Sequence, residues 1–143
     1  MSQDKIKNEI TIIIVLYKED YNLLFKTLDK IRDFKKIIID NSNNLELKKK
    51  VEANFKIEKY VLNKKNNGFS SGYNQGVKLC ETDFLMILNP DCIIDNESVI
   101  KLYEKLIFNE DCFLTTPTSY SENNQLTYTG GLLPENGEKD FPI

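Results

Sequence analysis

The sequence contains no histidine, and its 143 residues include only three cysteines. Without histidine, no Ser-His or Cys-His nucleophile can form and no imidazole can bind a metal. A general base or a metal ligand therefore has to be sought mainly among aspartate and glutamate. The cysteines Cys80, Cys92 and Cys112 share no CxxC spacing. An odd number of scattered cysteines fits reduced thiols in the cytoplasm better than a disulfide framework.

The sequence also lacks a basic cluster and a long apolar run. Its net charge is −3, and the short run Lys48 to Lys50 falls on an expected helix, so nucleic acid is not an expected partner. The first expected strand has its longest apolar run from Ile12 to Tyr17, which is far too short to cross a bilayer. The polar residues Met1 to Asn8 give no expectation of a secretory signal. With 41% apolar and 29% charged residues, the composition is that of a globular protein.

Apolar, β-branched runs alternate with helix-forming segments along the chain. This alternation predicts right-handed crossovers and a parallel sheet. The length of 143 residues suits one domain or part of a larger one. If the first four strands take the order 3-2-1-4, the first and fourth are neighbours at the point where such sheets bind ligands. The expected strands are 10–17, 36–40, 57–62, 84–88, 112–116 and a short edge strand at 126–129; the expected helices follow Asp20, span 45–53, follow Ser70 or Ser71, and follow Asp95.

The apolar run from Phe84 to Leu88 stops abruptly at Asn89, Pro90 and Asp91. Because the run has no polar alternation, it fits a strand buried on both faces of a parallel sheet. Pro90 cannot donate to a ladder, so pairing should end there. The strand would then deliver Asn89 and Asp91 to the carboxyl edge of the sheet, where a carboxylate can hold a hard divalent cation and, through it, phosphate oxygens. The alternative is an ordinary turn, since all three residue types form turns.

Gly68, Gly72 and Gly76 are spaced by four, which on a helix gives one stripe without side chains. Each interior glycine costs about 1 kcal/mol of helix stability relative to alanine, so the stripe needs a compensating reason. Packing of the helix against a strand and close approach of its backbone to a ligand are both consistent with the spacing. The pattern is not GxGxxG and follows the third expected strand, so a nicotinamide-binding fingerprint is not supported.

Tyr17 and Asp40 end the first and second expected strands. Asp40 either bonds its own backbone, as loop aspartates commonly do, or accepts a hydrogen bond from the imide N–H of uracil or thymine, or from a ribose hydroxyl. Tyr17 either packs against the strand end or stacks on such a base. With the expected strand order, both residues and the Asn89–Asp91 segment converge on one crevice.

Four motifs follow one another in the sequence: Ile12 to Tyr17, Ile38 to Ser42, Asn67 to Gly76, and Leu88 to Asp91. Together they resemble family 2 glycosyltransferases, and more narrowly the rhamnosyltransferase-type branch of bacterial surface-polysaccharide enzymes. The resemblance implies an α/β fold with a mostly parallel sheet and flanking helices, the Rossmann-like nucleotide-binding part of a GT-A fold. Residues 1–143 would then be a single nucleotide-sugar-binding domain, the incomplete amino-terminal part of such an enzyme.

The resemblance also implies a nucleoside-diphosphate sugar as donor, with UDP or dTDP as the nucleotide. By position, Tyr17 would flank the base, and Asp40 would bond the base or the ribose. Asn67, Gly68 and Asn74 would line the diphosphate and sugar side of the donor.

A divalent cation, Mg²⁺ or Mn²⁺, is the implied cofactor. Asp91 matches the final acid of the family's DxD-type motif, which meets the metal, and Asn89 replaces the leading acid. The replacement leaves one fewer anionic ligand, so we expect weak metal affinity until the diphosphate supplies its own oxygens. The family's general base lies in a second half that this sequence does not match. It is therefore expected beyond Ile143, and no catalytic residue is assigned.

As an enzyme or part of one, the chain would transfer a sugar such as rhamnose to a glycan or lipid-linked acceptor in bacterial surface polysaccharide synthesis. The alternative is a non-catalytic nucleotide-sugar-binding or assembly module. A signalling receiver domain fits less well, because Leu16-Tyr17-Lys18 stands where clustered acids are needed. The expected location is the cytoplasm. Peripheral attachment at the inner face of the membrane and self-association through an apolar sheet edge are further expectations to test.

Overall fold

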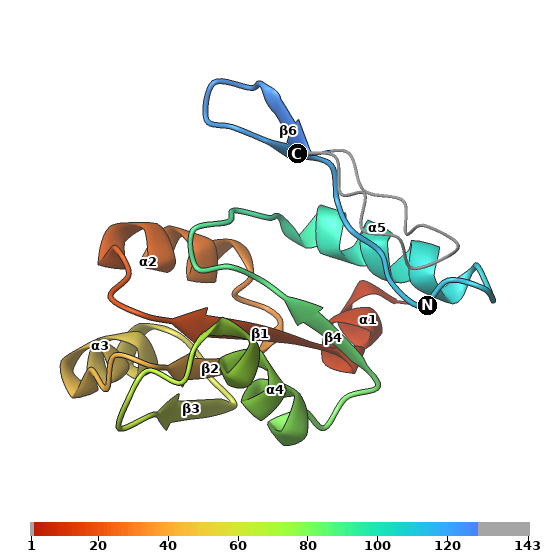
Figure 1. Ribbon diagram of the computed structural model, residues 1–143. Coiled ribbons are helices and arrows are strands. Elements are labelled where there is room, and N and C mark those ends of the chain that lie inside the picture. Colours follow the sequence, from red (N-terminus) through yellow and green to blue (C-terminus); the bar gives the residue numbers. More distant parts are fainter. Residues whose placement is uncertain (1, 129–143) are drawn as a thin grey trace, which may run out of the picture. The chain divides into compact units, whose positions relative to one another are not determined.

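Four parallel strands and the helices that connect them form the first of two units in this chain (Figure 1). The computed structural model describes residues 2–128. The units are Met1–Ile100 and Lys101–Ile143. The elements in chain order are α1 (Gln3–Glu9), β1 (Ile10–Leu16), α2 (Tyr21–Lys30), β2 (Lys35–Asp40), α3 (Leu45–Asn54), β3 (Lys59–Leu62), α4 (Phe69–Leu79), β4 (Phe84–Ile87), α5 (Asn96–Ile107), β5 (Ser119–Tyr120) and β6 (Leu126–Tyr128).

The strand order in the first unit is β3-β2-β1-β4, with every neighbouring pair parallel. This confirms the predicted order and the α/β fold class. The register aligns Leu16 with Asp40 and Asp40 with Leu62, so β1, β2 and β3 end level with one another. The last residue of β4, Ile87, aligns with Ile13, well before the end of β1. The segment after β4 therefore leaves the sheet beside the last residues of β1.

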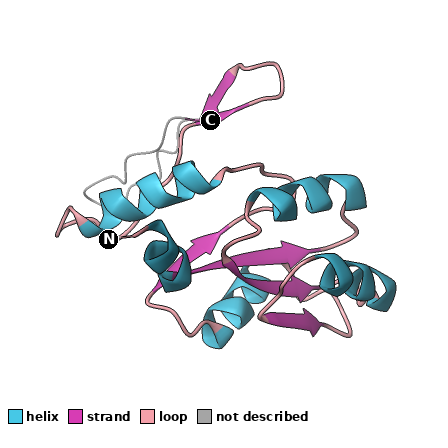
Figure 2. Cartoon of the chain, turned by 180° about the vertical axis from the view of Figure 1, so that it is seen from behind, coloured by secondary structure: helices cyan, strands magenta, loops and turns pink. Residues whose placement is uncertain are grey.

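The central strands β1 and β2 are covered on both faces. Helix α4 packs on β1 and β2, where Tyr73 joins Ile13, Val15, Ile37 and Ile39 in one buried cluster. Because side chains alternate along a strand, the intervening residues face the opposite side. The right-handed connections from β1 to β2 and from β2 to β3 place α2 and α3 on this opposite side. The connection from β3 back to β4 runs the other way across the sheet and places α4 on the first side. Figure 2 shows the same layers from behind.

The glycine stripe packs a helix against a strand. A Cβ on Gly72 would lie 2.8 Å from Cγ1 of Val15, and one on Gly76 would lie 2.4 Å from Cγ2 of Ile13. These two glycines therefore let α4 approach β1 closely, which resolves their role as packing. Gly68 differs, because its φ of +84° lies in the left-handed region and nothing surrounds its Cβ position. It is the N-cap of α4, so the prediction of a serine cap is wrong.

Strand β4 departs from its prediction. It was expected to be buried on both faces, but Leu85 is 41% and Ile87 is 52% exposed. Both residues lie on the α4 side, because they pair in register with Thr11 and Ile13. Helix α4 covers β1 and β2 rather than β4, and β4 is an edge strand among the described residues. An apolar run of residues therefore does not guarantee that helices cover both faces of the strand.

Helix starts follow their predicted caps in two cases. The Asp20 carboxylate accepts from the backbone N–H of Asn22 at 2.7 Å at the start of α2. The Asp95 carboxylate accepts from the N–H of Ser98 at 2.7 Å at the start of α5. Helix α1 was not predicted, because its polar residues carry little apolar periodicity beyond the buried Ile6.

The second unit contains a two-stranded antiparallel sheet of β5 and β6. Its turn is closed by the N–H of Ser121 donating to the carbonyl of Gln125 at 2.8 Å. The prediction of a strand at 112–116 is wrong, since this segment forms no ladder. The edge strand predicted at 126–129 is observed as β6 up to Tyr128, and Thr129 lies outside the described residues. No helix in residues 2–128 is long and apolar enough to span a membrane.

Candidate functional site

Three of the predicted site segments lie at one edge of the sheet. Tyr17 follows the carboxyl end of β1, Asp40 ends β2, and Asn89 to Asp91 follow β4. Strand β1 lies between β2 and β4. The connection after β1 leads to β2 on one side, and β4 is the neighbour of β1 on the other side. This is the topological switch point at which open α/β sheets bind ligands. The three segments therefore end at one edge of the sheet, and their meeting in a single crevice stays a prediction.

Asp40 is completely buried and already bonded within the protein. Its side chain is 0% exposed. Oδ1 accepts from the N–H of Ser42 at 2.6 Å, and Oδ2 accepts from the N–H of Asn44 at 3.3 Å. Oδ2 also accepts from the hydroxyl of Tyr60 at 3.2 Å. The carboxylate thus fixes the loop after β2, and its bond to a base or ribose stays a prediction.

Tyr60 supports Asp40 from β3. Burial raises the pKa of the Tyr60 phenol well above its usual value, and the neighbouring Asp40 carboxylate raises the pKa further. The phenol therefore keeps its proton and remains a hydrogen-bond donor to Asp40 throughout the working pH range. The register places Tyr60 beside Ile38, which puts its ring on the same face as Asp40.

A buried amide network connects the ends of β2 and β3 with α4. Nδ2 of Asn63 donates to Oδ1 of Asn41 at 2.8 Å and to Oε1 of Gln75 at 2.9 Å. Nδ2 of Asn41 donates to the carbonyl of Gly68 at 3.2 Å. The network fixes the start of α4 relative to two strand ends. Sequence reasoning missed Asn63 and Gln75, although Asn63 follows β3 directly, just as Asn41 follows β2.

The start of α4 carries the residues predicted for the diphosphate and sugar side. Asn67, Gly68 and Asn74 are all exposed. Gly68 provides no side-chain cap for the helix, and its own N–H donates to Oδ1 of Asn66 at 2.8 Å. The first N–H groups of a helix have no intrahelical partners, and the helix dipole adds partial positive charge there. The uncapped end is thus suited to an anion, and the role of these residues stays a prediction.

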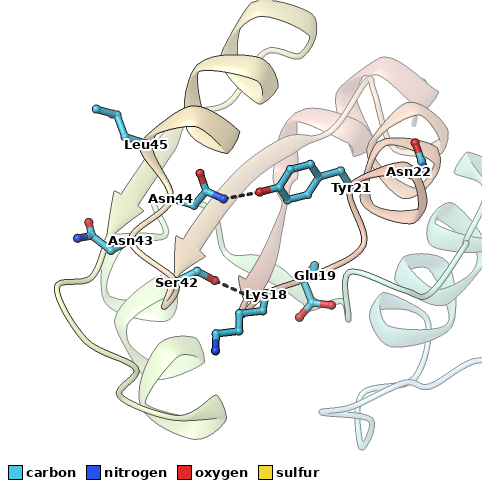
Figure 3. Close-up of a pocket in the computed structure, with 8 residues that line it drawn as sticks. All are labelled: Lys18, Glu19, Tyr21, Asn22, Ser42, Asn43, Asn44 and Leu45. Carbon is cyan, nitrogen blue, oxygen red and sulfur yellow. Dashed lines mark hydrogen bonds between the residues drawn. The ribbon is translucent and has the colours of Figure 1, made fainter.

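The loops after β1 and β2 line a pocket of about 730 Å³ (Figure 3). The N–H of Lys18 donates to Oγ of Ser42 at 2.7 Å, and Nδ2 of Asn44 donates to the hydroxyl of Tyr21, so two bonds join the loops. Lys18 has a φ of 59°, an uncommon conformation for a residue other than glycine. Tyr17 precedes the pocket and is 45% exposed. The pocket is lined by Lys18, Glu19, Tyr21, Asn22, Ser42, Asn43, Asn44 and Leu45.

The segment after β4 presents two polar side chains around a buried proline. Asn89 and Asp91 are exposed, whereas Pro90 is buried. The N–H of Cys92 donates to the carbonyl of Asn89 at 3.1 Å and closes a turn. Burial raises the pKa of the Cys92 thiol, and the Asp91 carboxylate raises it further, so the thiol remains protonated. The exposed carboxylate of Asp91 is therefore the strongest metal donor of the turn.

The donor set of this turn fits a hard cation that is bound with its substrate. Among residues 2–128, no three His, Cys, Asp or Glu side chains are grouped to hold a metal alone. Asp91 offers an exposed carboxylate, and Asn89, two residues earlier, offers an amide oxygen that also accepts from the Tyr73 hydroxyl at 3.3 Å. Mg²⁺ is characteristically held by one or two carboxylates together with waters and phosphate oxygens. The residues thus fit Mg²⁺ or Mn²⁺ on a diphosphate, and metal dependence stays a prediction.

Comparisons with known proteins identify the family of this chain. Residues 11–139 match the model of glycosyl transferase family 2. The chain is also 29% identical over 107 residues to the low-salt glycan biosynthesis hexosyltransferase Agl10 of Haloferax volcanii, across 71% of this chain and 34% of that relative. The chain thus spans about a third of the relative's length. That relative comes from an archaeon and is named a hexosyltransferase, so the rhamnosyltransferase branch is not distinguished. The family match, which covers most of the sequence, shows that this chain belongs to glycosyl transferase family 2.

Proposed function

We propose that this chain binds a nucleoside-diphosphate sugar at the carboxyl edge of its sheet, for transfer of the sugar to a glycan or lipid-linked acceptor. The observation that carries the proposal is the convergence of Tyr17, Asp40 and Asp91 at the ends of neighbouring strands. The family match and the hexosyltransferase name of the relative support glycosyl transfer. UDP and dTDP are the nucleotides to test, and rhamnose is one candidate sugar.

The base and ribose would bind near the pocket between the loops after β1 and β2. Tyr17 is about half-exposed beside this pocket and offers a ring face for stacking. Asp40 fixes the second loop through the N–H groups of Ser42 and Asn44. A preorganised loop binds a nucleotide without losing conformational freedom on binding, which favours affinity.

The diphosphate would lie between the start of α4 and the turn after β4. The uncapped N-terminal N–H groups of α4 suit phosphate oxygens. Asn67 and Asn74 are exposed near this helix end and would contact the diphosphate or the sugar. Asp91, with Asn89 beside it, would hold Mg²⁺ or Mn²⁺ against the diphosphate. When bound, the cation stabilises the negative charge that develops on the departing nucleoside diphosphate.

The test is titration calorimetry of UDP and dTDP with and without Mn²⁺, in the wild type and in Asp91→Ala. Opposite unit charges at about 4 Å and an effective dielectric near 20 interact by about 4 kcal/mol. We therefore expect Asp91→Ala to remove the Mn²⁺-dependent affinity, with a loss of at least about 100-fold. Asp91 is exposed, so the unfolding free energy should stay within about 0.5 kcal/mol of the wild type.

The matched control is Asp83→Ala, which removes an exposed carboxylate just before β4, at the opposite end of the same strand. It should bind as the wild type does. Equal Mn²⁺-dependent binding by the wild type and Asp91→Ala would reject the metal site. Nucleotide binding without sugar transfer in the presence of acceptor would favour the alternative of a binding module. The cytoplasmic location, attachment to the membrane surface and self-association are separate proposals, the last of which light scattering can test.

A further inference from the structure

Two buried hydroxyl groups hold the turn after β4 from opposite faces of the sheet. We propose that Thr27 and Tyr73 are positioning residues that orient the Asn89-Pro90-Asp91 turn, so that the Asp91 carboxylate meets the cation on a bound diphosphate. The inference rests on the proposed function for its ligand. It assigns to α2 and α4 an indirect role in metal-dependent binding, which for α4 is separate from the contacts proposed between its start and the diphosphate.

Thr27 holds the turn from α2. Its side chain is 0% exposed, and its hydroxyl donates to the carbonyl of Pro90 at 2.9 Å. A threonine inside a helix usually bonds back to a carbonyl of its own preceding turn. Here the hydroxyl instead bonds a carbonyl 63 residues further along the chain. That carbonyl belongs to the peptide group joining Pro90 to Asp91, so the bond fixes the backbone from which the Asp91 side chain projects.

Tyr73 holds the turn from α4. It is 4% exposed, and its hydroxyl lies 3.0 Å from the carbonyl oxygen of Leu88 and 3.3 Å from Oδ1 of Asn89. The single hydroxyl proton is shared between the two acceptors, with the carbonyl of Leu88 closer. Burial raises the pKa of Tyr73 to about 12, so the hydroxyl remains a donor at every working pH. The bonds fix the peptide group before Asn89 and the direction of the Asn89 amide.

The two hydroxyl groups leave the turn little freedom. The ring of Pro90 fixes its own φ, and the N–H of Cys92 closes the turn on the carbonyl of Asn89. Pro90 is buried, whereas Asn89, Asp91 and Cys92 are exposed. A metal ligand has to be held within about 0.5 Å of its productive position. A turn tied on both sides provides this precision on a segment with no regular secondary structure.

A purely structural role is the competing explanation, because the buried carbonyl of Pro90 needs a donor in any case. The experiment therefore compares Thr27→Val, which keeps the shape but loses the hydroxyl, with Thr27→Ser, which keeps the hydroxyl. Titration calorimetry with UDP should show Mn²⁺-dependent affinity about 10-fold weaker in Thr27→Val and largely restored in Thr27→Ser. Affinity for UDP without Mn²⁺ should be unchanged in both variants. Tyr73→Phe should lower the Mn²⁺-dependent affinity in the same direction.

A double-mutant cycle separates positioning from general destabilisation. In an Asp91→Glu background, which keeps a carboxylate and therefore a measurable Mn²⁺-dependent affinity, Thr27→Val should cause a smaller loss of that affinity than in the wild type, because its effect passes through the position of the Asp91 side chain. An equal loss in both backgrounds would overturn the inference. The inference would also be overturned if Thr27→Val lowered the Tm but left the ratio of UDP affinities with and without Mn²⁺ unchanged. Should Thr27→Val fail to fold, Tyr73→Phe provides the same cycle.

The inference can fail separately from the proposed function. If the wild type binds neither UDP nor dTDP in a Mn²⁺-dependent way, the proposed function is wrong. The orientation of the turn is then measured by hydrogen exchange of the Cys92 amide, which bonds the carbonyl of Asn89. Exchange should be faster in Thr27→Val and Tyr73→Phe than in the wild type and in Thr27→Ser. Equal exchange in all four proteins would show that the two hydroxyl groups do not hold the turn.

Discussion

Strand β2 carries one buried charge at each end, and the two ends differ in what the charge organises. Lys36 and Asp40 are both 0% exposed, and their even spacing places them on the same face. Asp40 bonds the loop after the strand through the N–H groups of Ser42 and Asn44. Nζ of Lys36 instead donates to carbonyls before the strand, namely those of Ile31 at 3.2 Å, Arg32 at 2.8 Å and Phe34 at 2.6 Å.

A buried charge therefore does not by itself mark a functional site. Lys36 satisfies carbonyls at and after the end of α2, where a cation also suits the negative end of the helix dipole. Asp40 satisfies N–H groups in a loop that contributes residues to the pocket at the carboxyl edge. Both side chains solve the same physical problem, because a charge removed from water must be paired with polar groups. We therefore expect Lys36 to affect folding alone and Asp40 to affect folding and ligand binding together.

The largest expected effect is that of Asp40→Ala. Removing the carboxylate leaves the N–H groups of Ser42 and Asn44 and the hydroxyl of Tyr60 without their acceptor. We expect the free energy of unfolding to fall by about 3 kcal/mol, and UDP affinity to fall by at least about 10-fold because the loop is no longer preorganised. Urea denaturation and titration calorimetry measure the two effects.

Tyr60→Phe removes one of the three donors to Asp40 and serves as the graded control. It should cost about 1 kcal/mol of unfolding free energy and a smaller part of the affinity. A protein with Asp40→Ala that binds UDP as the wild type does would show that the two ends of β2 are equivalent, and the comparison would fail.

The next largest effect is a pH dependence at the other end of β2. Burial lowers the pKa of Lys36 from its usual 10.5 to about 8, although the Asp33 carboxylate opposes the shift. Between these values the unfolded chain binds more protons than the folded one, so the free energy of unfolding rises with pH. Below the folded pKa the cost of the buried charge is fully present. Between about pH 7.5 and about pH 9.5 the wild type should gain about 2 kcal/mol relative to Lys36→Met.

Denaturation of both proteins at the two pH values measures this gain, and the difference between them removes the contribution of other titrating groups. Lys36→Met should leave UDP affinity unchanged, which sharpens the contrast with Asp40. A stability difference that does not vary with pH would mean that Lys36 is not held as a buried charge.

The sequence predicted the architecture well, because the strands are strongly apolar and the turns between them strongly polar. It could not predict the exposure of β4. The run Phe84 to Leu88 resembles the buried run of β1, yet Leu85 and Ile87 are exposed because α4 lies on β1 and β2. Burial depends on which element covers a strand, and local sequence does not carry that information. The stretch 112–116 was also apolar enough to suggest a strand, but it has no pairing partner among the described residues.

The sequence predicted where the candidate site residues lie along the strands, but not the hydrogen bonds that they form. Asn89 and Asp91 are exposed at the carboxyl edge as expected, because a proline ends the preceding strand. Asp40 was placed at the correct strand end, but its burial could not be predicted, since its partner Tyr60 lies 20 residues away. Long-range bonds of this kind leave no local pattern. Thr27, Tyr60 and Asn63 help to fix the site but escaped sequence reasoning, and Tyr73 and Gln75 stood within the Asn67–Gly76 motif without an assigned role.

The central claim is that a nucleotide and its cation bind at the carboxyl edge of the sheet, and paramagnetic broadening by Mn²⁺ tests it most directly. The measurement is an amide correlation spectrum of the ¹⁵N-labelled chain with UDP, recorded during addition of Mn²⁺. We expect the amide signals of Gly68, Asp91 and Cys92 to broaden first, and those of Lys36 and Thr82, at the amino edge, to remain sharp. Broadening centred on the amino edge, or spread evenly over both edges, would contradict the account.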